Sequence, residues 1–258
     1  MRDRLIEIGT PDGPMETFIT HPEQDGPFPG VILYQDFWGV REELYDLARM
    51  VGMAGYYVMV PDLLHRAERI RTDIRDADNR MMSSWKLTKE QFERALRPLM
   101  QTTDDMVIRD TAALLEFLRQ ESAAGPGPMG AFGYCFGGRL ILRVAGAFPE
   151  RFRACAGMHG TNLVSGEPDS AHLSMPTVRG ELYFGFAEHD DWATPAMQAV
   201  LKADAERYGV RAWLERHPGA HHGYALPNRD IFDKRAFYRD WEMIFAMFAR
   251  QLAPTPTG

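Results

Sequence analysis

The chain has 258 residues, of which 45% are hydrophobic and 25% charged, and its formal net charge is −7. This length suits one domain with a sizeable core, and the composition excludes a largely disordered chain. An acidic chain lacks the clustered cations that nucleic-acid binding needs, and no apolar run approaches the roughly 20 residues that span a bilayer. The N-terminus shows no apolar signal segment, and two cysteines form no disulfide framework, so we expect a cytoplasmic protein.

The first part of the chain predicts a hairpin and then a strand–helix–strand unit. Two alternating segments flank an Asp12-Gly13 turn, which is a strong hairpin signal. Two continuous apolar runs follow, typical of strands buried on both faces, with a helical pattern between them. The predicted elements are strands at 4–9, 15–20 and 30–35, a helix at 41–54 and a strand at 56–60.

The second half repeats the alternation of strand and helix. The predicted elements are helices at 104–119, 136–148, 194–208 and 230–252, and strands at 129–134, 153–158, 181–186 and 211–216. Such alternation after an initial hairpin predicts an α/β fold with a mostly parallel, doubly wound sheet and an N-terminal antiparallel hairpin, in one domain over residues 1–258.

Residues 63–103 interrupt this pattern and predict a helical insertion. Arginines alternate with acidic residues over its first part, and Met81, Met82 and Trp85 follow. One interpretation is a solvated insertion whose charges compensate one another. The other is a cap over a pocket, which lends one arginine and some Met or Trp surface to a substrate.

The sharpest motif is Gly133-Tyr134-Cys135-Phe136-Gly137-Gly138, at a predicted strand-to-helix junction. It has the G-x-S-x-G form of a nucleophile elbow with cysteine in place of serine. The helix N-terminus favours the thiolate of Cys135, and the Phe136 N–H is free to donate to an oxyanion. The alternative is a small buried cysteine, which is our interpretation of Cys155 in its apolar strand.

A cysteine nucleophile of this kind needs a base and a group that orients it. In this architecture the acid follows a late strand and the histidine precedes the last helix. Adjacent candidates occupy both places, namely Asp190 or Asp191 in a turn and His221 or His222 on a loop. The order of the residues leaves both pairs of alternatives open. No zinc-like ligand spacing is present, and we predict neither a metal site nor a cofactor.

The loop after the first long strand is the expected source of the second oxyanion donor, through Phe37 or Trp38. Asp36 precedes them, and because an unpaired buried carboxylate is costly it should have a partner. That partner is an arginine from the insertion or the Cys135 thiol; the alternative is a loop carboxylate that caps local N–H groups. Candidate pocket residues are Trp38, Tyr134, His159 and Tyr224.

Together these motifs resemble the dienelactone hydrolase family over about residues 5–252. The matching segments are Gln35-Asp36-Phe37-Trp38-Gly39-Val40, Val60-Pro61-Asp62-Leu63, Gly133-Tyr134-Cys135-Phe136-Gly137-Gly138, Ala187-Glu188-His189-Asp190 and Pro218-Gly219-Ala220-His221-His222-Gly223-Tyr224. The resemblance implies an α/β-hydrolase fold and a triad of Cys135, His222 and Asp190. It also places the oxyanion donors at Phe136 and at Phe37 or Trp38.

Two positions depart from the pattern of this family. The type enzyme has a glutamate, which holds the thiol proton in the resting state, where this chain has Asp36. Of the two arginines that bind the substrate carboxylate there, one corresponds to Leu226, with Arg229 further on. The resemblance therefore implies that Asp36 modulates the state of the thiol, and it does not name the substrate.

We accordingly expect a hydrolase that cleaves a small-molecule ester or lactone through a thioester acyl-enzyme, with no nucleic-acid or membrane partner, as a monomer or small homo-oligomer. The same triad can also cleave thioesters or carbon–halogen bonds. The alternative from another class is a non-catalytic, ligand-binding or thiol-redox protein on the same fold, because an exposed, ionised thiol also senses oxidants.

Overall fold

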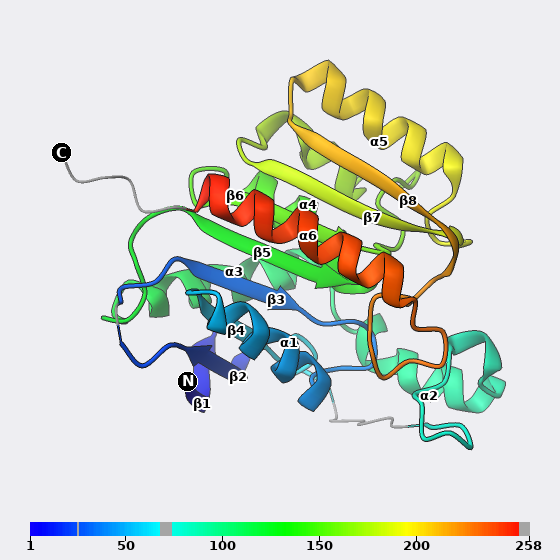
Figure 1. Cartoon of the computed structure of the whole chain (residues 1–258), viewed down its shortest axis with the longest axis horizontal. Coiled ribbons are helices and arrows are strands. Elements are labelled where there is room, and N and C mark those ends of the chain that lie inside the picture. The colour runs from blue at the N-terminus through cyan, green and yellow to red at the C-terminus, as the bar shows by residue number, and fades with distance from the viewer. Residues whose placement is uncertain (25, 68–73, 253–258) are drawn as a thin grey trace.

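The computed structural model of the chain describes residues 1–24, 26–67 and 74–252. An eight-stranded sheet runs through its centre in the order β1-β2-β4-β3-β5-β6-β7-β8 (Figure 1). The strands are β1 (Arg2–Thr10), β2 (Gly13–His21), β3 (Gly30–Tyr34), β4 (Tyr57–Pro61), β5 (Met129–Tyr134), β6 (Phe152–Met158), β7 (Glu181–His189) and β8 (Ala212–His221). The α-helices are α1 (Glu42–Met53), α2 (Lys89–Met100), α3 (Asp104–Leu118), α4 (Phe136–Ala147), α5 (Pro195–Tyr208) and α6 (Lys234–Gln251), and two short 3₁₀ helices are η1 (Ser84–Lys86) and η2 (Ala171–Thr177).

The pairing of the strands confirms the predicted architecture. β1 and β2 form an antiparallel hairpin, and β2 continues antiparallel onto β4. From β4 to β8 every neighbouring pair is parallel, as the strand–helix alternation predicts. The carboxyl ends of the parallel strands therefore meet at one edge of the sheet, where ligands of open α/β folds bind.

Helices cover both faces of the sheet, which explains why its central strands are apolar throughout. Val31 and Leu33 of β3 pack in the core that α1 and α6 cover, whereas the alternate residues Ile32 and Tyr34 pack under α3, α4 and α5. Figure 1 shows α1 and α6 on one side of the sheet and α3 and α4 on the other. Among the described residues, no helix is both long and apolar enough to cross a bilayer.

The last two strands are longer than the sequence pattern predicts. β7 continues to His189 and β8 to His221, and these two residues pair with each other beyond a bulge. Residues 187–189 of the turn predicted at 187–191 and residues 218–221 of the loop predicted at 218–224 therefore belong to strands. The extension is possible because parallel pairing satisfies backbone groups whatever the side chains, and it carries Asp190 and His222 to the very ends of neighbouring strands.

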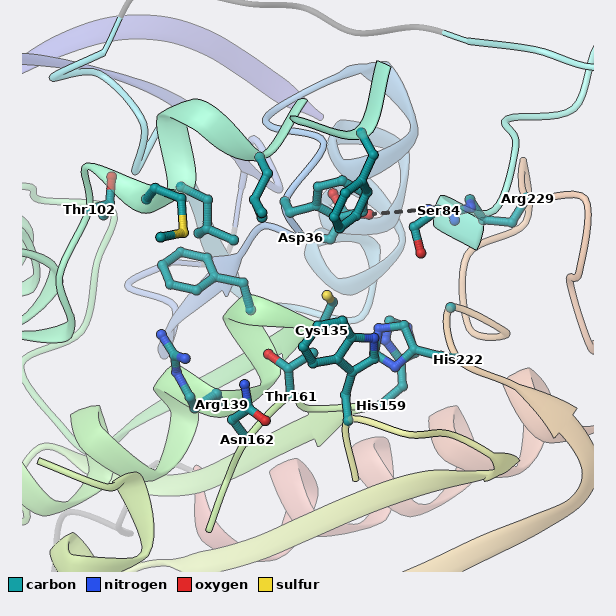
Figure 2. Close-up of a pocket in the computed structure, with 18 residues that line it drawn as sticks. Asp36, Ser84, Thr102, Cys135, Arg139, His159, Thr161, Asn162, His222 and Arg229 are labelled. Atoms are coloured by element: carbon teal, nitrogen blue, oxygen red, sulfur yellow. Dashed lines mark ion pairs between the residues drawn. The ribbon is translucent and has the colours of Figure 1, made fainter. Parts of the chain in front are cut away.

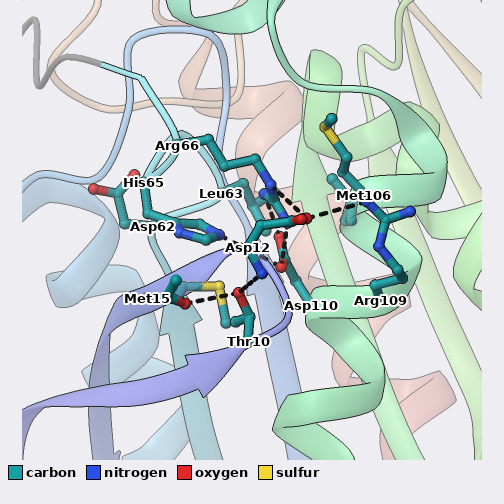
Figure 3. A network of polar contacts seen from close by, with 12 residues as sticks. Thr10, Asp12, Met15, Asp62, Leu63, His65, Arg66, Met106, Arg109 and Asp110 are labelled. Carbon is teal, nitrogen blue, oxygen red and sulfur yellow. Dashed lines mark hydrogen bonds and ion pairs between the residues drawn. The ribbon is translucent and has the colours of Figure 1, made fainter.

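A buried ion pair anchors the segment that leaves β4. Asp110 of α3 is fully buried, and it accepts two hydrogen bonds from Arg66, at 2.8 and 2.6 Å (Figure 3). Arg66 also donates to Asp12 in the hairpin turn, at 2.9 Å. The start of the predicted insertion is thereby tied to both the hairpin and α3. Residues 68–73 of the insertion lie outside the described part of the chain.

The rest of this segment, residues 74–103, forms a cover over the carboxyl edge of the sheet, and we call it the cover. It contains η1 and α2. α2 begins at Thr88, which forms a reciprocal capping box with Gln91. Of the α2 residues only Ala95 and Pro98 are fully buried, so the helix lies on the molecule rather than inside it.

Candidate active site

Cys135 lies at the tight turn between β5 and α4, at the carboxyl edge of the sheet. Its backbone has φ 55° and ψ −113°, a conformation in which non-glycine residues are strained. The glycines on either side permit this turn: a Cβ on Gly133 would lie 2.5 Å from the Gly137 carbonyl oxygen, and a Cβ on Gly137 would lie 2.2 Å from that of Tyr34. The motif therefore has the geometry of a nucleophile elbow, which projects the sulfur away from the sheet.

His222 and Asp190 meet beside this sulfur. The Nδ1 of His222 lies 2.8 Å from Oδ2 of Asp190, whose side chain is completely buried. The other oxygen of Asp190 accepts from the backbone N–H of Trp192 at 2.9 Å. Because the carboxylate fixes Nδ1 as the protonated nitrogen, Nε2 is left for the thiol. The alternative residues Asp191 and His221 are both exposed.

The surroundings of His222 favour the charged form of its imidazole. Burial alone would lower the pKa of His222, but the negative charge of Cys135 and the hydrogen bonds to Asp190 and Cys135 raise it to about 10. Cys155, by contrast, lies in the core in β6, where burial raises the pKa of its thiol. The two cysteines therefore have opposite surroundings, and only Cys135 has a basic partner among the described residues.

Two backbone N–H groups near Cys135 are candidates for binding an oxyanion. Phe136 is the first residue of α4, so its N–H has no partner within the helix. The Trp38 N–H donates to Oδ1 of Asp36 at 3.2 Å, so the N–H of Phe37 is the remaining candidate for the second donor on this loop. The Gly137 N–H donates to the Gln35 carbonyl at 3.0 Å and so fixes the loop against the elbow.

Asp36 is buried, and its partner is Arg41, just before α1. Arg41 donates to both carboxylate oxygens, at 2.7 and 3.1 Å, and also to Glu43, at 2.7 Å. Burial alone would lower the pKa of Arg41, but these two carboxylates raise it. The expected partner, an arginine of the insertion or the thiol, is therefore replaced by an arginine outside residues 63–103. Two nitrogens of the planar Arg41 guanidinium donate to the two oxygens of Asp36, which is a bidentate contact.

Arg229 is a second buried cation at this site. Its guanidinium is 5.4 Å from the centre of the Trp38 ring, and Nη1 lies 3.9 Å from Oδ2 of Asp36. Burial lowers its pKa, and its Nε has no hydrogen-bond partner among the described residues. The long ion pair with Asp36 and the negative charges of Asp230 and Cys135 offset this cost only in part, so Arg229 remains available to an anionic or strongly polar group.

These residues surround a cavity of about 420 Å³, whose lining side chains Figure 2 shows. The sulfur of Cys135 lies near its middle, with His222 close by. The sheet edge and α4 supply one wall, and α2 supplies the other. The lining residues are Asp36, Phe37, Ser84, Phe92, Leu96, Leu99, Met100, Thr102, Cys135, Phe136, Arg139, His159, Thr161, Asn162, Trp192, His222, Gly223 and Arg229.

Of the four candidate pocket residues, only His159 lines this cavity. Tyr134 and Tyr224 are fully buried in the core, and the Tyr224 hydroxyl donates to Asp240 at 2.7 Å. Trp38 is also buried, against Phe37 at 4.4 Å between ring centres. Sequence places these residues beside the motif but does not show which way they point. The structure therefore does not bring Trp38, Tyr134 or Tyr224 to the cavity.

His159 packs edge to face against the catalytic candidate His222, with ring centres 4.9 Å apart. Its backbone has φ 39°, and neither ring nitrogen has a hydrogen-bond partner among the described residues. Burial, with the positive charges of His222 and Arg229, lowers its pKa well below the ordinary value. His159 is therefore a neutral imidazole. Within the described residues, no cluster of three or more His, Cys, Asp or Glu side chains forms a metal site.

Several lining residues were not singled out by the sequence analysis. Arg139, Thr161 and Asn162 come from α4 and from the loop after β6. The apolar residues of α2 also line the cavity, which favours the cap interpretation of the insertion. A helical spacing of Phe92, Leu96 and Leu99 was available as a signal, but spacing alone does not tell which surface an apolar face covers.

Comparison with known proteins agrees with this arrangement. The model of the dienelactone hydrolase family matches residues 15–252. A protein of Synechocystis sp. named "Putative carboxymethylenebutenolidase" is 22% identical over 255 residues, which cover 98% of each chain. A "Probable 2-oxo-3-(5-oxofuran-2-ylidene)propanoate lactonase" of Bradyrhizobium sp. is 22% identical to this chain over 241 residues, which cover 92% of this chain and 89% of that protein.

Solved structures show the same fold. The crystal structure of a "Putative Dienelactone Hydrolase" from Klebsiella pneumoniae superposes with a TM-score of 0.82 at 18% identity and covers 96% of this chain and 98% of that one. A dienelactone hydrolase-like promiscuous phosphotriesterase from metagenomic libraries has a TM-score of 0.72 at 17% identity, with 98% of this chain and 100% of that chain covered. The fold is that of the α/β-hydrolases, and the match of the family model over nearly the whole chain shows that this protein belongs to the dienelactone hydrolase family.

Proposed function

We propose that this protein hydrolyses carboxylic esters or lactones through a cysteine nucleophile. The observation that carries the proposal is the strained Cys135 beside the hydrogen-bonded pair of His222 and Asp190, at the wall of a cavity. A backbone conformation of this kind persists only where the surroundings impose it, and such strain is concentrated at reactive sites.

In the proposed reaction the Cys135 sulfur attacks the carbonyl carbon, and the carbonyl oxygen becomes an oxyanion. The N–H groups of Phe136 and Phe37 donate to this oxyanion, and each donor contributes roughly 3 kcal/mol to transition-state stabilisation. His222 gives its proton to the leaving alkoxide as the C–O bond breaks, and a thioester remains on Cys135. His222 then takes a proton from water, which attacks the thioester and releases the acid and the free sulfur.

Asp36 has a part in this proposal as a modulator of the thiol state. Its carboxylate lines the cavity, and a free negative charge there would oppose a thiolate. Arg41 neutralises that charge through its bidentate contact, and Arg229 adds a second positive charge. We therefore propose that the Asp36–Arg41 pair keeps the surroundings of Cys135 compatible with an ionised sulfur.

The test is burst kinetics with p-nitrophenyl acetate and a simple lactone, with the mass of the acylated protein measured in parallel. We expect Cys135→Ala to lose the burst and the added acetyl mass, with kcat/KM lowered by about 10³-fold or more. Cys155→Ala is the matched control, because it removes the other cysteine from the core and should retain the burst.

His222→Ala distinguishes the rival redox or ligand-binding role. A hydrolase should lose its burst in this variant, whereas a protein that only binds or is oxidised at Cys135 should tolerate it. Full ester hydrolysis by Cys135→Ala would overturn the proposed function.

A further inference from the structure

Helix α2 turns part of its apolar face toward the cavity beside Cys135. Phe92, Leu96 and Leu99 are only partly buried, and all three line the cavity. The opposite face of the helix carries exposed charged residues such as Glu93, Arg94 and Arg97. A surface helix normally packs its apolar stripe against other side chains. Here Ala95 packs with Trp38 and Leu99 reaches the main core, but Phe92, Leu96 and Leu99 also border a cavity of about 420 Å³, which an apolar ligand would fill.

The facing wall is apolar as well, and it begins at the reactive carbonyl position. The side chains of Phe136 and Phe37 line the cavity, and the backbone N–H groups of the same residues are the proposed oxyanion donors. The ring of Phe37 lies 6.4 Å from that of Phe92, which brings the two walls together beside Cys135. A substrate carbonyl held by these donors would therefore have hydrocarbon surface directly next to it.

The position of His222 decides which half of an ester lies under α2. The imidazole must reach the leaving oxygen to protonate it, so the alcohol lies on the His222 side. A second cavity of about 500 Å³, with Trp85 and Trp192 among its walls, also borders His222 and gives that alcohol room. Figure 2 shows Thr102 and Arg139 on the other side of Cys135 from His222. The acyl group therefore points away from His222, toward the C-terminal end of α2.

Two polar side chains at that end already have partners, although the Nε of Arg139 has none among the described residues. Arg139 donates to Asp104 at 2.6 Å, and the Thr102 hydroxyl donates to the Pro98 carbonyl at 3.1 Å. A charged acyl tail would have to displace these contacts, whereas an alkyl chain need not. From Phe92 to Met100 the helix rises about 12 Å, which matches an extended chain of roughly eight to ten carbons.

We propose that the acyl group of the substrate is an uncharged, medium-length hydrocarbon chain, which lies between α2 and the Phe37–Phe136 wall. This inference rests on the proposed function, because it assigns the substrate class of the same site. It makes the cover a determinant of specificity: the elbow provides the reaction, and the apolar face of α2 selects the acyl chain.

Two substrate series test the proposal on the unmodified protein. In the first, p-nitrophenyl esters range from acetate to dodecanoate. We expect kcat/KM to rise about fourfold per added methylene up to octanoate, as burial of each methylene in an apolar site implies, and to fall for dodecanoate. In the second, acetate esters of ethanol to octanol should show little dependence on chain length, because the alcohol lies outside the α2 cavity.

A pair of variants locates the effect. Leu96→Trp fills the cavity and should lower the ratio of octanoate to acetate kcat/KM at least tenfold. Arg97→Trp places the same side chain on the solvent face of the same helix and should leave that ratio unchanged. Comparable effects of both variants would overturn the assignment to α2.

The outcomes separate this inference from the proposed function. A flat acyl series, or a steeper dependence on the alcohol than on the acyl chain, would overturn the acyl assignment while Cys135-dependent hydrolysis stands. If no ester of either series is hydrolysed, the proposed function and this inference both fail.

Discussion

The elbow around Cys135 and the cover of residues 74–103 face each other across the cavity but are held in place in different ways. The elbow is enclosed by backbone: every residue from Met129 to Gly138 in this strand-to-helix turn is buried. In the cover, little of α2 is buried, and polar contacts such as the one between Ser83 and Asp230 hold the cover in place. The contrast indicates that the reaction geometry is fixed by sterics that tolerate little change, whereas the specificity surface lies on a helix that can vary.

The largest effect is expected from Gly137→Ala, which tests the rigid half of this comparison. The new Cβ would lie 2.2 Å from the Tyr34 oxygen and 2.5 Å from that of Gln35, both backbone atoms that cannot move aside locally. Because the turn must shift, we expect a destabilisation of at least about 3 kcal/mol. We also expect a loss of activity of about 10²-fold or more, since Cys135 is displaced. Urea unfolding and ester hydrolysis measure the two effects.

Gly166→Ala is the matched control for this variant. It also adds one methyl group to a glycine, but in an exposed loop with no atom within 4 Å of the new Cβ. It should be neutral in both assays. If Gly137→Ala were equally neutral, the backbone contacts would not be what fixes the elbow.

The same contrast explains what the sequence could predict. The strands, the hairpin and the elbow follow from local signals. These are, in turn, the apolar runs, the Asp12-Gly13 turn, and glycines at positions where side chains would collide. Chain order within such a fold reduced the acid and the base to two adjacent candidates each, the family resemblance favoured Asp190 and His222, and the structure brings these two within 2.8 Å. Features determined by neighbouring backbone were therefore accessible from one sequence.

Features determined by side-chain direction were not accessible. Tyr134 and Tyr224 belong to motif segments, yet both point into the core, because residues next to a catalytic group can lie on the opposite face of a strand or turn. The pairing of Asp36 with Arg41 was missed for a similar reason: several arginines were available, and only the folded loop shows which one reaches both oxygens.

A smaller effect, on the anchoring of the segment that leaves β4, is expected from Asp110→Ala. The carboxylate is fully buried and receives two hydrogen bonds from Arg66, whose side chain is also largely buried. Its removal leaves a buried guanidinium with less compensation, so we expect a destabilisation of about 3 kcal/mol. Unfolding in urea measures it, and acetate hydrolysis by the folded protein should change much less than in Gly137→Ala.

The double variant Arg66→Met/Asp110→Leu sharpens this result. Replacing both charges by apolar side chains of similar size removes the unpaired cation, so most of the lost stability should return. A double variant as unstable as Asp110→Ala would mean that the ion pair itself, and not the cost of an uncompensated charge, is what stabilises this junction.

The smallest effects are expected where the cover meets the loop after His222. Asp230 accepts from the Ser83 hydroxyl at 2.5 Å and from its N–H at 3.1 Å, and it pairs with Lys86 at 2.8 Å. Asp230→Asn weakens charge-assisted hydrogen bonds at a buried group, and we expect a loss of about 1–2 kcal/mol. Since Lys86 is half-exposed, Lys86→Met should cost less than about 0.5 kcal/mol.

If α2 selects the acyl chain, loosening the contact between Ser83 and Asp230 should raise KM for octanoate more than for acetate. Equal changes in KM for the two esters would instead indicate that the contact between Ser83 and Asp230 serves stability alone.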